Sequence, residues 1–148
     1  GSDVTDRNKL DIKKLATSIF SDEKKQKILN GILWPEVYLL MNHAAEQAEN
    51  NGSQIFIVDA ALLFEAGYSE YFDSTLLITA SKKKRVQRIL SRRNIPIDQI
   101  EKRMSLQMPE NKKKKLADFT IINDSDLSKL YNQAEKIYNS LKIDMHNK

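Results

Sequence analysis

Apolar residues in the first third of the chain recur at intervals of three and four, which is the spacing of one helix face. A first helix is predicted after Asp11, whose side-chain oxygen can cap it. A second helix is predicted after Ser21. Pro35 is expected to end that helix and to open a third, which Gly52 closes.

The next part of the chain alternates short apolar runs with helical patterns. The run Gln54–Val58 has no polar alternation, so it predicts a strand that is covered on both faces. Two more strands are predicted at Ser74–Thr79 and Phe119–Ile122. Predicted helices lie between and after them, at 61–66, from Ser81 to near 93, from Pro96 to before 109, at 110–117 and after Asp126. Strands that alternate with helices indicate an α/β fold with parallel crossovers.

The composition agrees with one domain or a piece of one, since 41% of the 148 residues are hydrophobic. The net charge of +4 suits a ligand that carries phosphate, although scattered lysines on solvated helix faces give the same value. Disulfides are excluded because there is no cysteine, and a site built from several histidines is excluded because there are only two. No apolar stretch approaches the length of a membrane span, which makes a cytoplasmic enzyme the default expectation.

Two carboxylates follow the first predicted strand. Ligands of open parallel sheets bind at the carboxyl ends of the strands, where Asp59 and Glu65 are expected to emerge. The alternative is that Asp59 caps the following helix and that Glu65 is solvated.

Cationic pairs at helical spacing are the other candidate chemistry. Arg88 and Arg92 are four residues apart, so both can reach a polyphosphate from one helix face. A solvated basic face is the alternative for them, and the run Lys112–Lys115 is expected to be solvated. Arg103 and Gln107 are also four apart. Nucleic-acid binding is disfavoured because no aromatic stacking platform is interleaved with the basic residues.

The segment from Asp59 to Glu65 resembles the D-x-P-L-L-(F/V)-E motif of dephospho-CoA kinases, small P-loop kinases that phosphorylate the ribose 3'-hydroxyl of dephospho-CoA with ATP. Five further segments resemble motifs of this family in the same order. They are Leu10–Leu15 with Ile19–Asp22, Ile32–Val37, Gln87–Arg93, Arg103–Pro109 and Ala117–Asn123. The resemblance thus extends over almost the whole chain.

Three positions depart from the family pattern. Trp34 stands where the family has His, Ala61 where it usually has Pro, and Asp124-Ser125 where a Gly commonly follows the Asn. In addition, the 148 residues contain no G-x-x-x-x-G-K-S/T loop, which would cradle the phosphates. The family carries this loop and the central strand before the point that matches residue 1, so we expect a fragment that is inactive alone and exposes sheet edges through which it self-associates.

The resemblance implies an adenylate-kinase-like P-loop kinase fold that uses ATP and Mg²⁺, with ATP and dephospho-CoA as its small-molecule partners and neither nucleic acid nor membrane. It implies a role in catalysis for Asp59, near Mg²⁺ or its waters, and for Arg92 and Arg103. It also implies that ATP is bound by Arg88, Arg92, Arg103, Gln107 and Asn123, although turn chemistry alone would also favour Asn123. The residues implied at the acceptor are Trp34, Pro35, Leu63, Phe64 and Glu65, although Trp34 also fits a core or hinge position.

The expected organisation is one domain with three parts. Residues 11–49 form a helical subdomain on the acceptor side, 54–80 and 118–142 form the core, and 81–117 form a basic helix and a lid. A second hypothesis remains open, in which the chain is a non-catalytic ligand-binding or assembly module derived from a nucleotide kinase.

Overall fold

A computed structural model describes residues 4–6, 9–20, 22–92 and 95–146. The chain forms two compact units, Gly1–Leu62 and Leu63–Lys148. Ser21 and Arg93, at which helix ends were predicted, lie outside the described residues.

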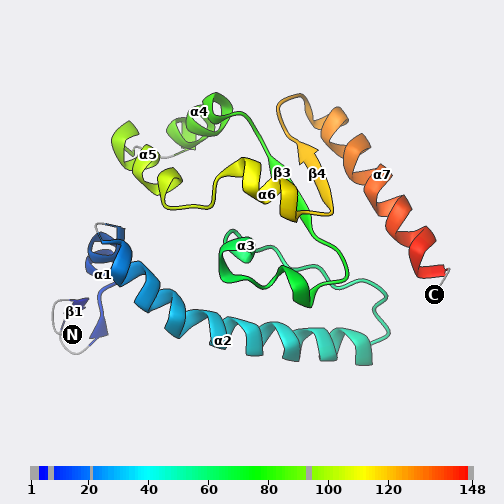
Figure 1. The fold of residues 1–148 in the computed structure, drawn as a ribbon, viewed down its shortest axis with the longest axis horizontal. Helices are drawn as coiled ribbons and strands as arrows, with labels where there is room; N and C mark the ends of the chain where they lie inside the picture. Colours follow the sequence, from blue (N-terminus) through cyan, green and yellow to red (C-terminus); the bar gives the residue numbers. More distant parts are fainter. Residues whose placement is uncertain (1–3, 7–8, 21, 93–94, 147–148) are drawn as a thin grey trace. The chain divides into compact units, whose positions relative to one another are not determined.

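The first unit begins with a small antiparallel pair of strands that the sequence analysis did not predict (Figure 1). Strand β1 (Thr5–Asp6) pairs with β2 (Lys9–Leu10). Helix α1 (Ile12–Phe20) follows, and the backbone N–H groups of Lys13 and Lys14 donate to Asp11 Oδ1 at 2.9 and 3.1 Å. The predicted cap at Asp11 is therefore confirmed.

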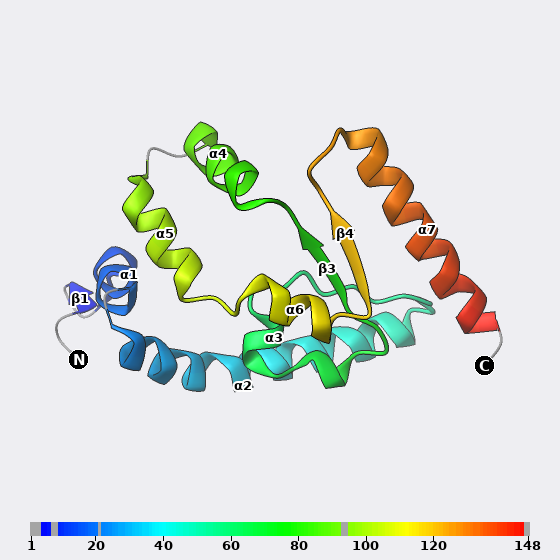
Figure 2. The same ribbon diagram turned by 45° about the horizontal axis from the view of Figure 1, so that its top comes forward.

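One long helix replaces the two that were predicted around Pro35. Helix α2 runs from Glu23 to Asn50 without interruption and contains Pro35 (Figure 2). A proline inside a helix removes one backbone hydrogen bond and costs about 3 kcal/mol. The helix continues because the turns on both sides keep their bonds and because the Asp22 side chain caps its first turn.

The predicted strand at Gln54–Val58 is wrong for this structure, which assigns neither helix nor strand to the run. Ile57 is 81% exposed, and Phe56 is also exposed. A strand requires a hydrogen-bonded neighbour, and within the described residues none pairs with this run. Its composition favours a strand, but composition cannot supply the partner.

The second unit contains the parallel sheet. Strand β3 (Leu76–Thr79) pairs in parallel with β4 (Phe119–Ile122), with Leu76 opposite Phe119 and Thr79 opposite Ile122. The strand at Phe119–Ile122 and the parallel direction are as predicted, whereas the strand predicted at Ser74–Thr79 begins two residues later, at Leu76. Ile121, at the centre of β4, is only 1% exposed.

Helices surround this sheet. Between the strands lie α4 (Lys82–Arg92), α5 (Ile97–Ser105) and α6 (Glu110–Leu116), and before β3 lie α3 (Leu63–Ala66) and the 3₁₀ turn η2 (Ser69–Tyr71). Helix α7 (Leu127–His146) follows β4 and packs against it (Figures 1 and 2). The predicted caps at Ser81 and Asp126 are confirmed, since they accept from the N–H groups of Lys84 and Lys129.

The starts of the two strands are joined by a carboxylate. Asp118 Oδ2 accepts from the backbone N–H and the hydroxyl of Thr75, both at 2.7 Å. These hydrogen bonds, that of the side chain above all, hold the pKa of the Asp118 carboxyl below its usual value. The hydrogen bonds between Thr75 and Asp118 therefore stabilise the register of β3 against β4 at the amino end of the sheet.

We expect this carboxylate to contribute to acid sensitivity. Its pKa is lower in the folded chain than in the unfolded chain, where it is about 3.9. The stabilisation is therefore complete above that value and is lost as the pH falls through the folded-state pKa. Asp118→Asn should lower the unfolding free energy near neutral pH by about 1 kcal/mol and flatten its decline below pH ~4. Urea unfolding at a series of pH values measures both effects. If the unfolding free energy of the variant declined at acid pH in the same way as that of the parent chain, Asp118 would not contribute to acid sensitivity.

No helix in the described ranges combines the length and the apolar composition required to cross a membrane.

Candidate functional site

Polar groups gather where β3 and β4 end. Asp124 Oδ1 accepts from the backbone N–H of Ser81 at 2.8 Å, and Lys84 Nζ donates to the backbone oxygen of Asp124. The hydrogen bond from the Ser81 backbone, with smaller contributions from the charges of Lys84 and Arg88, lowers the pKa of the Asp124 carboxyl. The amino end of α4 is thereby tied to the turn after β4, at the carboxyl edge of the sheet.

Arg88 and Asn123, both predicted on the ATP side, are brought into contact here. Arg88 Nη2 donates to the backbone oxygen of Asn123 at 2.9 Å and to its side-chain Oδ1 at 3.2 Å. The guanidinium is half-buried and has further N–H donors, since it carries five in all. The structure therefore fixes one arginine at the carboxyl end of β4. Arg92 is one turn further along α4 and is exposed.

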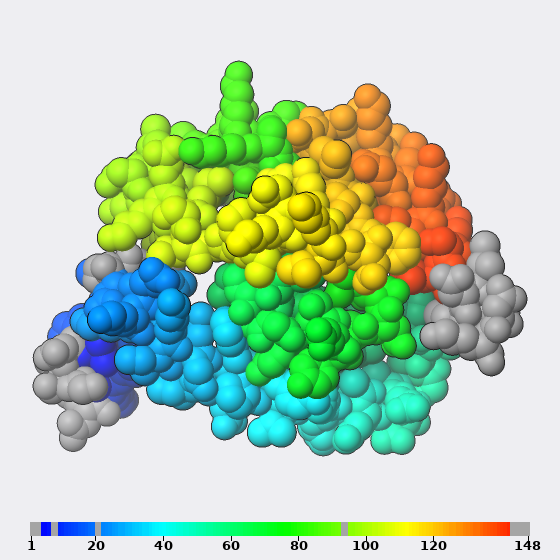
Figure 3. All heavy atoms as spheres, in the orientation of Figure 1, coloured from blue at the N-terminus to red at the C-terminus, as the bar shows by residue number. Residues whose placement is uncertain are grey.

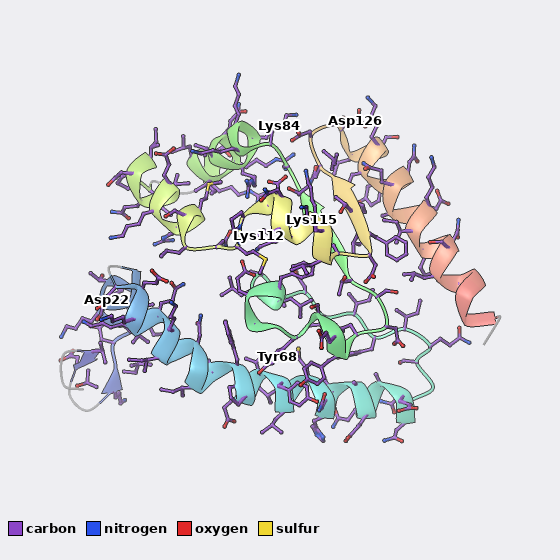
Figure 4. All side chains as sticks on the ribbon, in the orientation of Figure 1. Asp22, Tyr68, Lys84, Lys112, Lys115 and Asp126 are labelled. Atoms are coloured by element: carbon purple, nitrogen blue, oxygen red, sulfur yellow. The ribbon has the colours of Figure 1, made fainter. Side chains whose placement is uncertain are left out.

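Glu65 is the centre of a second cluster. The carboxylate Oε1 accepts from the backbone N–H of Met108 at 2.8 Å and lies 2.7 Å from Lys113 Nζ. The Glu65 and Lys113 side chains are only 14% and 12% exposed. The prediction that the run Lys112–Lys115 is solvated is therefore wrong for Lys113, although Lys112 and Lys115, labelled in Figure 4, are exposed.

A second ion pair involves helix α6, which also carries Lys113. Glu110 is 3.1 Å from Arg85 Nη2 on α4 and 3.0 Å from Lys114 Nζ. Burial raises the pKa of the Glu110 carboxyl, but hydrogen bonds from Lys114 and Thr79 and the charges of Lys114 and Arg85 outweigh burial and leave the pKa below its usual value. Helix α6 is thus paired with α3 through Lys113 and with α4 through Glu110.

The structure does not bring the other predicted site residues together. Asp59 is exposed, in the segment between α2 and α3, while the half-buried Trp34 and the exposed Pro35 lie within α2. These three belong to the first unit and the remaining candidates to the second. Of the latter, Leu63 and Phe64 are half-buried on α3, and Arg103 and Gln107 are exposed in the last turn of α5 and just beyond it.

Sequence reasoning missed Lys113 and its pairing. The helical spacing of Glu110 and Lys113 could have suggested it, because these two residues lie on one face of α6 and both are partly buried. Among the residues that the structure describes, no group of three or more acidic or histidine side chains could hold a metal ion.

A parallel pair of strands flanked by helices, with polar and cationic groups at the carboxyl ends of the strands, is characteristic of α/β nucleotide-binding proteins. A family model described as dephospho-CoA kinase matches residues 1–129, and the chain belongs to this family. The family resemblance and the P-loop-kinase-like α/β fold predicted from the sequence are both confirmed.

Two curated relatives are named dephospho-CoA kinase. That of Chlorobaculum tepidum is 30% identical over 139 residues, which are 94% of this chain and 66% of the relative. That of Chlorobium luteolum is 31% identical over 132 residues, which are 89% of this chain and 60% of the relative. The chain thus spans somewhat less than two thirds of the length of these relatives.

Solved structures, the following two among them, also resemble the chain. The crystal structure of TT1252 from Thermus thermophilus has a TM-score of 0.71 and 28% identity, and the match covers 93% of this chain and 69% of that one. Dephospho-CoA kinase from Campylobacter jejuni has a TM-score of 0.60, with the same coverage, and at 22% identity it supports the fold alone.

Proposed function

We propose that this protein acts in the ATP-dependent phosphorylation of the ribose 3'-hydroxyl of dephospho-CoA, which gives CoA. The observation that carries the proposal is the Arg88 guanidinium held by Asn123 at the carboxyl end of β4, in a chain of the dephospho-CoA kinase family. Ligands of α/β sheets bind at this end, and guanidinium groups bind phosphate oxygens with paired hydrogen bonds.

The nucleotide side of the proposed site is cationic. Arg88 is pre-positioned by its two hydrogen bonds to Asn123, and Arg92 presents a second guanidinium one turn further along the same helix. Arg103 and Gln107 come from the end of α5, which we assign to a lid that closes over ATP. Phosphoryl transfer depends chiefly on positioning and on the neutralisation of charge, both of which these side chains can supply.

The residues that we propose for the acceptor side are Trp34, Pro35, Leu63, Phe64 and Glu65. Asp59 is assigned to Mg²⁺ or its bound waters. An exposed single carboxylate fits this ion, because Mg²⁺ keeps several waters and is usually bound by one or two carboxylates together with substrate phosphates. When bound, the ion would neutralise phosphate charge. The residues themselves bind and orient the two substrates.

The phosphate loop is not among the 148 residues, which contain no G-x-x-x-x-G-K-S/T motif. The side chains of Arg88, Arg92 and Arg103 supply charge but cannot replace a cradle of backbone N–H groups. We therefore propose that these residues alone do not complete the active site. We also propose a cytoplasmic protein whose partners are small molecules. The 148 residues by themselves should self-associate through exposed strand edges.

The function is tested by coupled ADP release with the full-length gene product. ADP release should depend on dephospho-CoA and should be absent with CoA, in which the ribose 3'-oxygen already carries a phosphate. If the protein binds dephospho-CoA but releases no ADP, the non-catalytic binding module is the better account.

The chain of 148 residues, assayed beside the full-length gene product, should show no measurable dephospho-CoA phosphorylation, because no residue in it can replace the phosphate loop. Sizing chromatography of the same sample reports self-association. A rate close to that of the full-length product would mean that the phosphate site lies elsewhere in these residues.

A further inference from the structure

Helix α6 lies at the surface of its unit, where its atoms appear in yellow in Figure 3. Lys113 nevertheless lies largely out of solvent with Glu65, since their side chains are 12% and 14% exposed, in contrast to the exposed pair Lys27–Glu23, whose side chains are 75% and 69% exposed. An exposed pair contributes little, whereas removing one partner of a buried pair leaves an uncompensated charge. The Glu65–Lys113 pair therefore restrains α6 in a way that surface pairs do not.

The same carboxylate also holds the backbone in front of α6. Glu65 Oε1 accepts from the Met108 N–H across 43 positions of sequence. Met108 directly precedes Pro109, the N-cap residue of α6, and directly follows Gln107. The Glu65 Oε1 atom thus holds both the Met108 N–H, two residues before the start of α6, and the Lys113 side chain within α6.

Helix α6 is also attached to α4, and this second attachment makes the restraint by Glu65 effective. Glu110 pairs with Arg85, three residues before Arg88 on α4. With Lys113 paired to α3 and Glu110 paired to α4, α6 is held to two elements of the unit. The backbone of Gln107 is consequently attached to a fixed helix on its carboxyl side.

We propose that Glu65 is a positioning residue for the nucleotide side of the site: through Lys113 and the Met108 N–H it fixes the start of α6 and thereby the place of Gln107. The inference rests on the proposed function, since Gln107 is assigned there to ATP. In this proposal Glu65 holds the segment between the lid at the end of α5 and helix α6, in addition to its proposed role at the acceptor.

Two double variants, of which only one keeps a side-chain oxygen that can accept from the Met108 N–H, separate positioning from the loss of the ion pair. Glu65→Gln with Lys113→Met removes both charges and keeps an oxygen that can accept from Met108 N–H. Glu65→Leu with Lys113→Met also removes both charges but leaves no acceptor. Glu65 Oε2 has no hydrogen-bond partner within the described part of the chain, so Leu removes no further bond to it. Lys112→Met, at an exposed lysine of α6, is the matched control.

Both double variants should have similar Tm values, since each removes the buried charges together. Hydrogen exchange of the Met108 amide should be roughly tenfold faster in the Leu variant than in the Gln variant, because only the Leu variant loses the hydrogen bond. The KM for ATP should be higher by a similar factor of roughly ten in the Leu variant than in the Gln variant, whereas a change in the KM for dephospho-CoA reports the separate role of Glu65 at the acceptor. The Lys112→Met control should match the wild type in all measurements.

These measurements are made on the full-length gene product. Equal Met108 exchange and equal KM for ATP in the two double variants would overturn the positioning role. If the wild-type protein showed no kinase activity, the proposed function would fail, while Met108 exchange would still decide whether Glu65 fixes this segment.

Discussion

Replacing Asp59 by Asn in the full-length gene product is expected to lower kcat by about 10²- to 10³-fold, the range typical for loss of one group that stabilises charge at the reacting centre. The physical reason is charge. Asn keeps the size and the hydrogen-bonding oxygen of the side chain, but it cannot supply the negative charge that attracts Mg²⁺ and its waters. Because Asp59 is exposed, the substitution should leave the Tm almost unchanged.

The matched control for this variant is Asp73→Asn, which changes an exposed loop aspartate in the same way. It should leave both kcat and Tm at their wild-type values. Steady-state kinetics at several Mg²⁺ concentrations distinguish the two variants. If Asp59→Asn kept wild-type turnover at every Mg²⁺ concentration, Asp59 would have no place in the catalytic site.

Arg103→Lys is expected to reduce kcat/KM for ATP by roughly 10- to 100-fold, although the positive charge is retained. A planar guanidinium can bind two phosphate oxygens at once, whereas an ammonium group binds as a point charge. Part of the up to ~10⁵-fold contribution that an arginine can make to phosphoryl transfer should therefore survive in the Lys variant and be lost in Arg103→Ala.

The control for Arg103 is Lys102→Arg, at the neighbouring exposed position of α5. It should leave kcat and the KM for ATP unchanged, since no role in binding is assigned to Lys102. Wild-type kcat and KM for ATP in Arg103→Lys would show that the fork geometry of Arg103 is not used.

Features of the fold that depend on neighbouring residues were predictable from the sequence. The caps at Asp11, Ser81 and Asp126 are local hydrogen bonds that a few residues determine, and all three are present. Strand β4 was located exactly, because its apolar run is short and bounded by a polar turn.

Predictions that depended on distant partners were less successful. The run Gln54–Val58 has the composition of a strand but no paired neighbour among the described residues. Pro35 is accommodated inside α2 because the rest of this long helix offsets the free-energy cost of the proline. In the candidate site, the sequence indicated Arg88 and Asn123 separately. The contact between them, and the burial of Lys113 with Glu65, depend on tertiary packing that local patterns do not contain.

Identification of the reaction product tests the central claim most directly. The full-length gene product is incubated with dephospho-CoA and ATP labelled in the γ-phosphate, and the product is analysed by mass spectrometry and by phosphorus NMR. The account predicts that dephospho-CoA gains one labelled phosphate on its ribose 3'-oxygen and that ADP forms in equal amount. An unchanged acceptor, or a phosphate on any other atom of it, would contradict the account.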